Sequence, residues 1–234
     1  MKTFEILLLA LTAFLPPIIY AIWIRNTEKY HPEKWKPLIV CFLWGATIAV
    51  IASILLEVFF EVPLSLTVEK YSIPFFMAIL VAPLVEEFTK PLALNLKSVK
   101  KELTEIEDGF IYGAVAGLGF SATENLLYGI GFFSEGLFIF LVLMMMRSFG
   151  GCLLHASATA WTGYGYSKTI MKKTKAFRII PYFILAFIIH SLYNFLLTYK
   201  HIGAAVGLFC AFILVAFTIY VVRSRIKKLD VSHP

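Results

Sequence analysis

Residues 82–91 have the sequence APLVEEFTKP, which places two carboxylates and a lysine inside an otherwise apolar segment. A charged side chain deep in a bilayer costs at least a few kcal/mol, so residues of this kind usually serve a function. On a helix, Glu86 and Lys90 share a face at i and i+4, whereas Glu87 points about 100° away. We therefore expect this stretch to form half of an active site. The alternative is an ion pair at the membrane boundary, with Lys90 extending to the headgroups.

The composition is that of a multi-pass membrane protein. Hydrophobic residues make up 59% of the 234-residue chain and charged residues only 15%, which is too apolar for a soluble domain. The net charge of +6 is not accompanied by any nucleic-acid-binding motif, so no nucleic-acid partner is expected. Cys41, Cys152 and Cys210 stand singly in apolar segments, which argues against both disulfides and a cysteine zinc site.

Hydrophobic runs predict an all-α membrane helix bundle. A helix needs about 20 apolar residues to cross the hydrocarbon core, and the chain contains about seven such runs. Their predicted bounds are 4–24, 38–60, 74–96, 109–133, 137–164, 179–199 and 203–222. The first run lacks a small-residue cleavage site, so we interpret it as a span rather than a signal peptide.

Basic residues predict the orientation. Of the 21 Lys and Arg, 16 fall in alternating loops and the C-terminal tail, at 25–36, 97–101, 168–178 and 223–228. The positive-inside rule places these segments in the cytoplasm, with the N-terminus outside. Lys90 and Arg147 lie within spans and need partners there. Without any linker-like stretch, residues 1–234 are expected to form one integral membrane domain in the cell membrane.

The fourth predicted span combines small residues with a carboxylate. Gly109, Gly113 and Gly117 recur every four residues, a spacing that lets a neighbouring helix approach closely. Glu124 lies at a depth of about 13 Å in the same span, where a charge is costly. Ordinary membrane packing explains the glycines, but it does not explain Glu124.

Later spans supply further polar groups. The fifth holds Arg147 and His155, separated by Gly150-Gly151, and the sixth holds His190 and Asn194 on one face. His155 falls at a depth of about 27 Å, whereas the other polar groups lie at about 8–18 Å. We attribute this difference to a fifth span that begins several residues later than position 137. A bend at the two glycines, or a His155 outside the site, would also explain it.

Carboxylates on two spans and imidazoles on the next two are the components of a water-activating or metal site. The same residues are equally typical of an ion or proton path through a transporter or channel. Against a transporter, the chain shows no paired broken helices in two matching halves. An inactive helix-binding scaffold of the same fold would have no reason to bury these groups.

Four motifs resemble those of the PrsW family of intramembrane proteases, within the wider CAAX-processing protease superfamily. They are Glu86-Glu87-x-x-Lys90, Phe120-x-x-x-Glu124-Asn125, His155-x-x-x-Thr159-x-x-x-Gly163 and His190-x-x-Tyr193-Asn194. The motif-bearing core covers about residues 74–200, and the superfamily has a histidine where this chain has Glu124. The resemblance implies hydrolysis of a peptide bond in a single-pass or membrane-anchored protein, and the closest analogy is the first cleavage of an anti-sigma factor.

Hydrolysis in lipid needs a base for water and a donor for the oxyanion. We assign Glu86 as the general base, tuned by Glu87 and Lys90, with Asn194 as the oxyanion donor. Arg147 is expected either to share that task or to neutralise Glu124. The set of Glu124, His155 and His190 can hold zinc or can orient water without a metal, and both versions stay open. Membrane lipids are the other expected partners.

Overall fold

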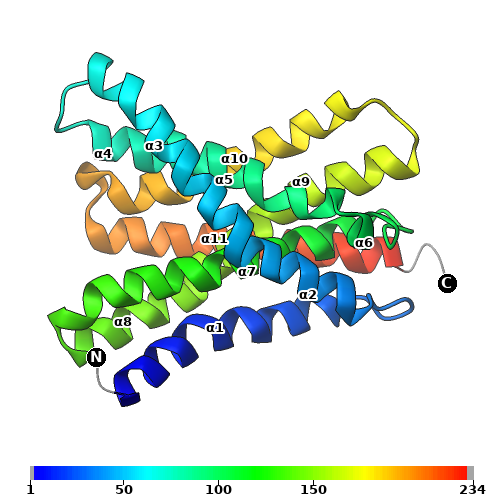
Figure 1. Ribbon diagram of the computed structural model, residues 1–234, viewed down its shortest axis with the longest axis horizontal. Coiled ribbons are helices and arrows are strands. Elements are labelled where there is room, and N and C mark those ends of the chain that lie inside the picture. The colour runs from blue at the N-terminus through cyan, green and yellow to red at the C-terminus, as the bar shows by residue number, and fades with distance from the viewer. Residues whose placement is uncertain (1–2, 231–234) are drawn as a thin grey trace.

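The computed structural model describes residues 3–230, and every secondary-structure element in that range is helical (Figure 1). This confirms the all-α prediction. The helical segments are α1 (Thr3–Arg25); α2 (Trp35–Trp44), η1 (Gly45–Ala49) and α3 (Val50–Thr67); α4 (Ile73–Phe76), η2 (Met77–Val81), α5 (Ala82–Thr89) and η3 (Lys90–Asn95); α7 (Asp108–Phe132); α8 (Leu137–Met146), η5 (Arg147–Gly151) and α9 (Cys152–Met171); η6 (Ala176–Ile179) and α10 (Ile180–Thr198); and α11 (Ala204–Asp230). Three short turns complete the chain: α6 (Lys97–Lys100), η4 (Phe133–Glu135) and η7 (Lys200–Ile202).

Apart from the three short turns, these helices form seven continuous segments, and each segment overlaps one of the predicted spans. Three of them continue seven or eight residues further than the hydropathy suggests, to Thr67, Met171 and Asp230. The reason is that hydropathy marks only the part of a helix suited to the hydrocarbon core. The helix itself continues into polar sequence because its backbone hydrogen bonds are internal.

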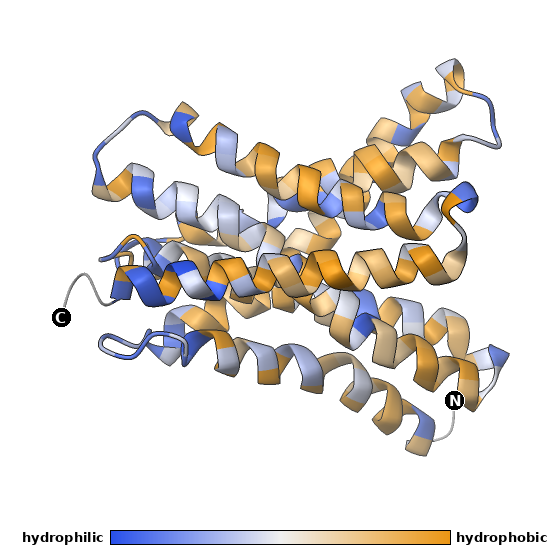
Figure 2. Cartoon of the chain, turned by 180° about the vertical axis from the view of Figure 1, so that it is seen from behind, coloured by the Kyte–Doolittle hydropathy of each residue, from blue (hydrophilic) through white to orange (hydrophobic). Residues whose placement is uncertain are grey.

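Within residues 3–230, five helices are long and apolar enough to cross a membrane, so the chain is an integral membrane protein. They are 3–25, 35–67, 137–171, 176–198 and 204–230. Figure 2 shows apolar residues along these helices and hydrophilic residues mainly in the loops and at helix ends. The other two predicted spans, 74–96 and 109–133, do not meet that criterion of length and hydropathy. The count of seven crossings stays a prediction.

α7 fails the hydropathy criterion because it is surrounded by protein. It lies in the middle of the bundle, and most of its first half is completely buried (Figure 1). A helix that faces other helices needs small residues and tolerates polar ones, whereas a helix that faces lipid must be apolar. The glycine stripe lies against α9: a methyl group on Gly109 would lie 2.2 Å from the backbone oxygen of Gly163, and one on Gly117 would lie 2.3 Å from that of His155.

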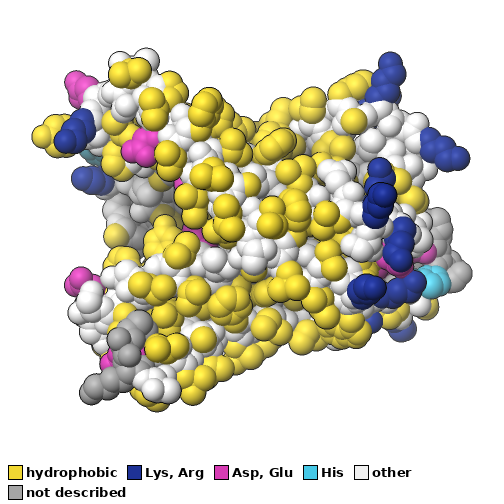
Figure 3. Space-filling view, viewed as in Figure 1, with side chains coloured by type: hydrophobic (Ala, Val, Ile, Leu, Met, Phe, Trp, Pro, Cys, Tyr) yellow, Lys and Arg dark blue, Asp and Glu magenta, His cyan; other side chains and the backbone are white. Residues whose placement is uncertain are grey.

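Basic side chains gather at one end of the molecule, where α11 ends, and α1 begins at the opposite end (Figures 1 and 3). We call the first the basic end; it includes the α1–α2 loop (26–34) and the loop preceding α7 (101–107). This separation matches the predicted alternation of the loops. The assignment of the basic end to the cytoplasm remains a prediction.

Candidate active site

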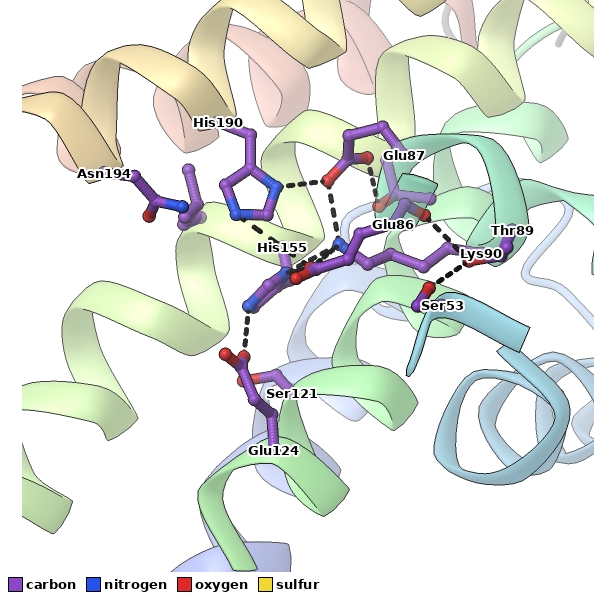
Figure 4. Close-up of polar contacts among 12 residues, drawn as sticks. Ser53, Glu86, Glu87, Thr89, Lys90, Ser121, Glu124, His155, His190 and Asn194 are labelled. Atoms are coloured by element: carbon purple, nitrogen blue, oxygen red, sulfur yellow. Dashed lines mark hydrogen bonds and ion pairs between the residues drawn. The ribbon is translucent and has the colours of Figure 1, made fainter. Parts of the chain in front are cut away.

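The Glu-Glu-x-x-Lys stretch forms a buried ion-pair cluster on α5 and η3. Nζ of Lys90 lies 2.9 Å from Oε2 of Glu86 and 2.8 Å from Oε1 of Glu87, and the lysine side chain is fully buried (Figure 4). The i,i+4 and i,i+3 spacings produce both contacts directly. Lys90 therefore pairs with both carboxylates inside the bundle and does not extend to a boundary.

Glu87, on α5, contacts side chains of two other helices, α9 and α10. Its side chain is completely buried; it accepts a hydrogen bond of 2.8 Å from the hydroxyl of Thr159 on α9 and lies 2.9 Å from Nδ1 of His190 on α10. An ionised carboxylate only accepts hydrogen bonds, so Nδ1 of His190 carries the proton and Nε2 is left as an acceptor. Glu87 thus orients the second imidazole.

Glu124 orients the first imidazole in the same way. Its Oε2 lies 2.7 Å from Nε2 of His155 and 2.8 Å from Nη2 of Arg147. A different nitrogen of Arg147, Nε, donates to Oδ1 of Asn125 at 2.8 Å. On the other side of the His155 ring, Nζ of Lys90 lies 2.8 Å from Nδ1. An ammonium group only donates, so Nδ1 accepts and Nε2 carries the proton given to Glu124.

His155 therefore belongs to the cluster, although its predicted depth set it apart. The helix begins at Leu137, but its 35 residues to Met171 are more than a perpendicular crossing requires, so a membrane span that begins later than position 137 stays a prediction. The π-helical turn η5 at Arg147–Gly151 changes the rotation between Arg147 and His155.

The two imidazoles direct their acceptor nitrogens toward Glu86. Its buried Oε2, which pairs with Nζ of Lys90, lies 3.7 Å from Nδ1 of His155 and 4.0 Å from Nε2 of His190. One ligand atom from each of Glu86, His155 and His190 fits within a 4.8 Å group. Such a set suits zinc with a position left for water, and metal-bound histidines commonly donate their other N–H to a carboxylate. The carboxylate in this group is Glu86, whereas Glu124, the expected third ligand, lies behind His155.

Asn194 is held by a backbone carbonyl group that Pro83 leaves without its helical partner. The backbone N–H of Ala82 bonds to the carbonyl of Met77 in the π-helical turn η2, and Pro83 has no N–H to offer the next carbonyl, that of Ala78. The side-chain amide of Asn194 on α10 donates to that carbonyl at 2.8 Å. This bond ties α10 to the start of α5 and leaves the second amide hydrogen of Asn194 for other partners.

A cavity of about 580 Å³ adjoins the cluster, and Glu86, Glu124, Arg147, both histidines and Asn194 line it. Glu87 and Lys90 lie behind this lining. The cavity wall also includes Glu57 of α3, which the sequence analysis did not single out. Glu57 lies within a predicted span, so the cost of burying a charge, the argument applied to Glu86 and Glu124, would have identified it.

Comparisons with known proteins show the family of the chain. The family described as PrsW family intramembrane metalloprotease matches residues 33–222. Protease PrsW of Clostridioides difficile (strain 630) is 29% identical over 226 residues, which cover 95% of this chain and 90% of that relative. No solved structure matches the chain. With its polar groups gathered at one cavity inside a helical bundle, the chain belongs to the PrsW family and is a membrane-embedded protease.

Proposed function

We propose that the protein, as one integral membrane domain, hydrolyses a peptide bond of a single-pass or membrane-anchored protein, using a water molecule activated by Glu86. The observation that carries this proposal is the position of Glu86, which lines the cavity and faces the acceptor nitrogens of both histidines. Its carboxylate can take a proton from water at the cavity wall. By the motif resemblance, the first cleavage of an anti-sigma factor is the closest reaction.

The remaining groups act through the residues they hold. Glu87 and Glu124 fix the orientations of His190 and His155, and the Arg147–Glu124 ion pair performs the neutralising role expected for the arginine. Lys90 compensates the buried charges of Glu86 and Glu87. Asn194 is the proposed donor to the oxyanion through its second amide hydrogen, because its first is bound to Ala78.

In a second version of the site, with zinc, Glu86, His155 and His190 would hold the ion, and Glu86 would act as a ligand instead of as the base. A bound zinc ion would polarise the scissile carbonyl group and lower the pKa of water to about 7. The ammonium of Lys90 contacts two of these three residues, at 2.8 Å from His155 and 2.9 Å from Glu86. A metal ion and this ammonium therefore compete for the same ligand atoms, unless the lysine side chain moves toward Glu87.

Substitution of Glu86 tests the catalytic assignment. In reconstituted vesicles that contain a single-pass substrate, Glu86→Gln is expected to lower turnover at least about 100-fold, because removal of a general base typically costs 10²–10⁴ in rate. Glu61→Gln, at an exposed position on α3, is the matched control and keeps wild-type turnover. Unchanged turnover in Glu86→Gln would remove this residue from the mechanism.

Metal analysis distinguishes the two versions of the site. The zinc version predicts about one zinc per purified chain, lost in His190→Ala, together with inhibition by chelators. Protein that contains no zinc and keeps its activity in the presence of a chelator would leave the version in which carboxylate and imidazole groups orient water alone.

A further inference from the structure

A second cluster of carboxylates, all buried except the half-buried Glu105, lies at the basic end, between the α1–α2 loop and the start of α7. It consists of Glu28, Glu33, Glu105, Glu107 and Asp108, which we call the acidic cluster. Oxygens of Glu28, Glu33 and Asp108 lie within 4.8 Å of one another, and so do oxygens of Glu28, Glu105 and Glu107. Glu28 belongs to both groups and joins them into one cluster.

The protein holds some of these carboxylates in place with hydrogen bonds. Asp108 accepts backbone N–H groups from Thr104 at 2.6 Å and from Glu105 at 2.8 Å, and Glu33 accepts the hydroxyl of Tyr112. At the C-terminal end of α11, Asp230 accepts the backbone N–H groups of Lys29 and Tyr30, which fixes the loop that carries Glu28. The cluster is therefore part of an ordered structure and not a chance gathering of mobile side chains.

Glu28 itself has no partner in the part of the chain that the structure describes. Its side chain is 3% exposed, yet neither of its carboxylate oxygens has a hydrogen-bond partner. One oxygen of Glu105 and one of Glu107 are also buried without a partner. All these atoms are acceptors, so only a cation, a proton or a donor from outside the chain satisfies them.

Nearby basic side chains do not supply the missing charge. Within residues 3–230, no Lys or Arg nitrogen is paired with any of the five carboxylates; the nearest imidazole, that of His31, lies 3.6 Å from Glu105. Lys34 pairs with Glu102 at 2.8 Å, and Nε of Arg25 donates to the backbone carbonyl of Glu33. Burial, followed by the nearby charge of Asp108, raises the pKa of Glu28 to about 8 and that of Glu33 to about 9. These carboxylates are thus costly to ionise without a cation.

We propose that the acidic cluster binds a hard divalent cation, Ca²⁺ or Mg²⁺, through carboxylate oxygens alone. Oxygens on opposite sides of a bound Ca²⁺ are about 4.6–5.2 Å apart, which accommodates the 4.8 Å groups around Glu28. The ligand set is made of oxygens without thiolates, which suits these ions and not zinc. A surface cavity of about 300 Å³ is lined by three residues of the cluster, Glu33, Glu105 and Asp108.

The bound cation would connect the α1–α2 loop to α7, the helix that also carries Glu124. Asp108 and Glu124 are 16 residues apart on α7, so the acidic cluster lies about 24 Å along the helix from the protease site. The two sites share no residue. The cation is therefore expected to stabilise the position of α1 and α2 against α7 without taking part in hydrolysis.

Glu28→Gln tests the proposal, because the difference in unfolding temperature between this variant and the wild type is expected to change sign when divalent ions are added. In detergent without divalent ions, we expect Glu28→Gln to unfold at a higher temperature than the wild type, because a neutral amide avoids the cost of burying a carboxyl group without a partner. With CaCl₂ or MgCl₂, the unfolding temperature of the wild type is expected to rise above that of the variant, which no longer responds. Separate titrations with the two salts identify the preferred ion, and calorimetry measures its binding directly.

Two controls separate this effect from others. Glu102→Gln removes a surface carboxylate at the same end that pairs with Lys34, and it is expected to keep the full response to cations. His190→Ala changes the protease site and not the acidic cluster, so this variant is also expected to be stabilised by Ca²⁺ or Mg²⁺. The test of the acidic cluster therefore does not depend on whether the protease site binds zinc. A wild-type protein that neither binds nor is stabilised by Ca²⁺ or Mg²⁺, or an equal response in Glu28→Gln, would overturn the proposal.

Discussion

At the scale of single residues, the site depends on charges that are buried together and compensate one another. Lys90 contacts Glu86, Glu87 and His155, and each of the two histidines is oriented by a carboxylate on another helix. Removing one member of such a network leaves its partner buried without compensation, which costs more than the pair contributes. Substitutions of charged members are therefore expected to affect stability as well as activity, and neutral neighbours allow cleaner tests.

Thr159 and Thr162 on α9 form a matched pair for such a test. The hydroxyl of Thr159 donates to Glu87 at 2.8 Å, whereas that of Thr162 is buried without a partner among the described residues. Thr159→Val is expected to lower the free energy of unfolding by about 1–3 kcal/mol, because it removes a hydrogen bond to a charged group. Thr162→Val is expected to be neutral or stabilising. Thermal unfolding in detergent measures both, and equal losses would show that the Glu87 bond has no special role.

At the scale of helices, the close approach of α7 to α9 sets the position of His155. The backbone of α9 lies directly against the glycine stripe of α7, so the helix that carries Glu124 and the helix that carries His155 are held at a short distance. The π-helical turn η5 then brings Arg147 and His155 to the same carboxylate oxygen of Glu124. Helix packing in a membrane relies on small residues of this kind.

Gly117→Ala tests this packing. Its new methyl group would lie 2.3 Å from the backbone oxygen of His155, so the helices must separate. Overpacking of this kind costs about 1–3 kcal/mol, and a shift of about 1 Å in a catalytic group can lower the rate about 100-fold. We expect a lower unfolding temperature and a strong loss of proteolysis. Gly131→Ala on the same helix is the control, because nothing lies within 4 Å of its added methyl group. Similar activity in the two variants would contradict this role of the glycine stripe.

At the scale of the whole molecule, α1 begins at one end and α11 ends at the other, where the basic residues gather. This arrangement is consistent with an odd number of membrane crossings. The segments 73–95 and 108–132 decide the number. Both contain hydrophobic runs, but neither meets the stricter criterion that the other five helices meet, because one carries the charged cluster and the other is enclosed by protein. A topology measurement on these two segments is therefore the most informative.

Single cysteines at exposed positions provide that measurement. In a Cys210→Ser background, with Cys41 and Cys152 buried, we expect a membrane-impermeant maleimide to label Lys70→Cys and Ser134→Cys in intact cells. Lys101→Cys and Lys172→Cys are expected to react only after permeabilisation. The parent protein without these substitutions is the control. Labelling of Lys101→Cys in intact cells would contradict the prediction that residues 73–95 cross the membrane.

The sequence by itself determined the helical class, the approximate helix bounds and most of the polar site residues, because burying a charge in a bilayer is costly enough to be seen without coordinates. It did not determine the partners of those residues. Only the tertiary structure placed Glu86, and not Glu124, between the acceptor nitrogens of His155 and His190, and bound Asn194 to the carbonyl left free by Pro83. Likewise, Glu28 lies in the α1–α2 loop and Asp108 at the start of α7, and packing alone brings them together in one cluster. Such contacts depend on helix rotation and π-helical turns, which shift side chains by large angles while leaving the hydropathy pattern almost unchanged.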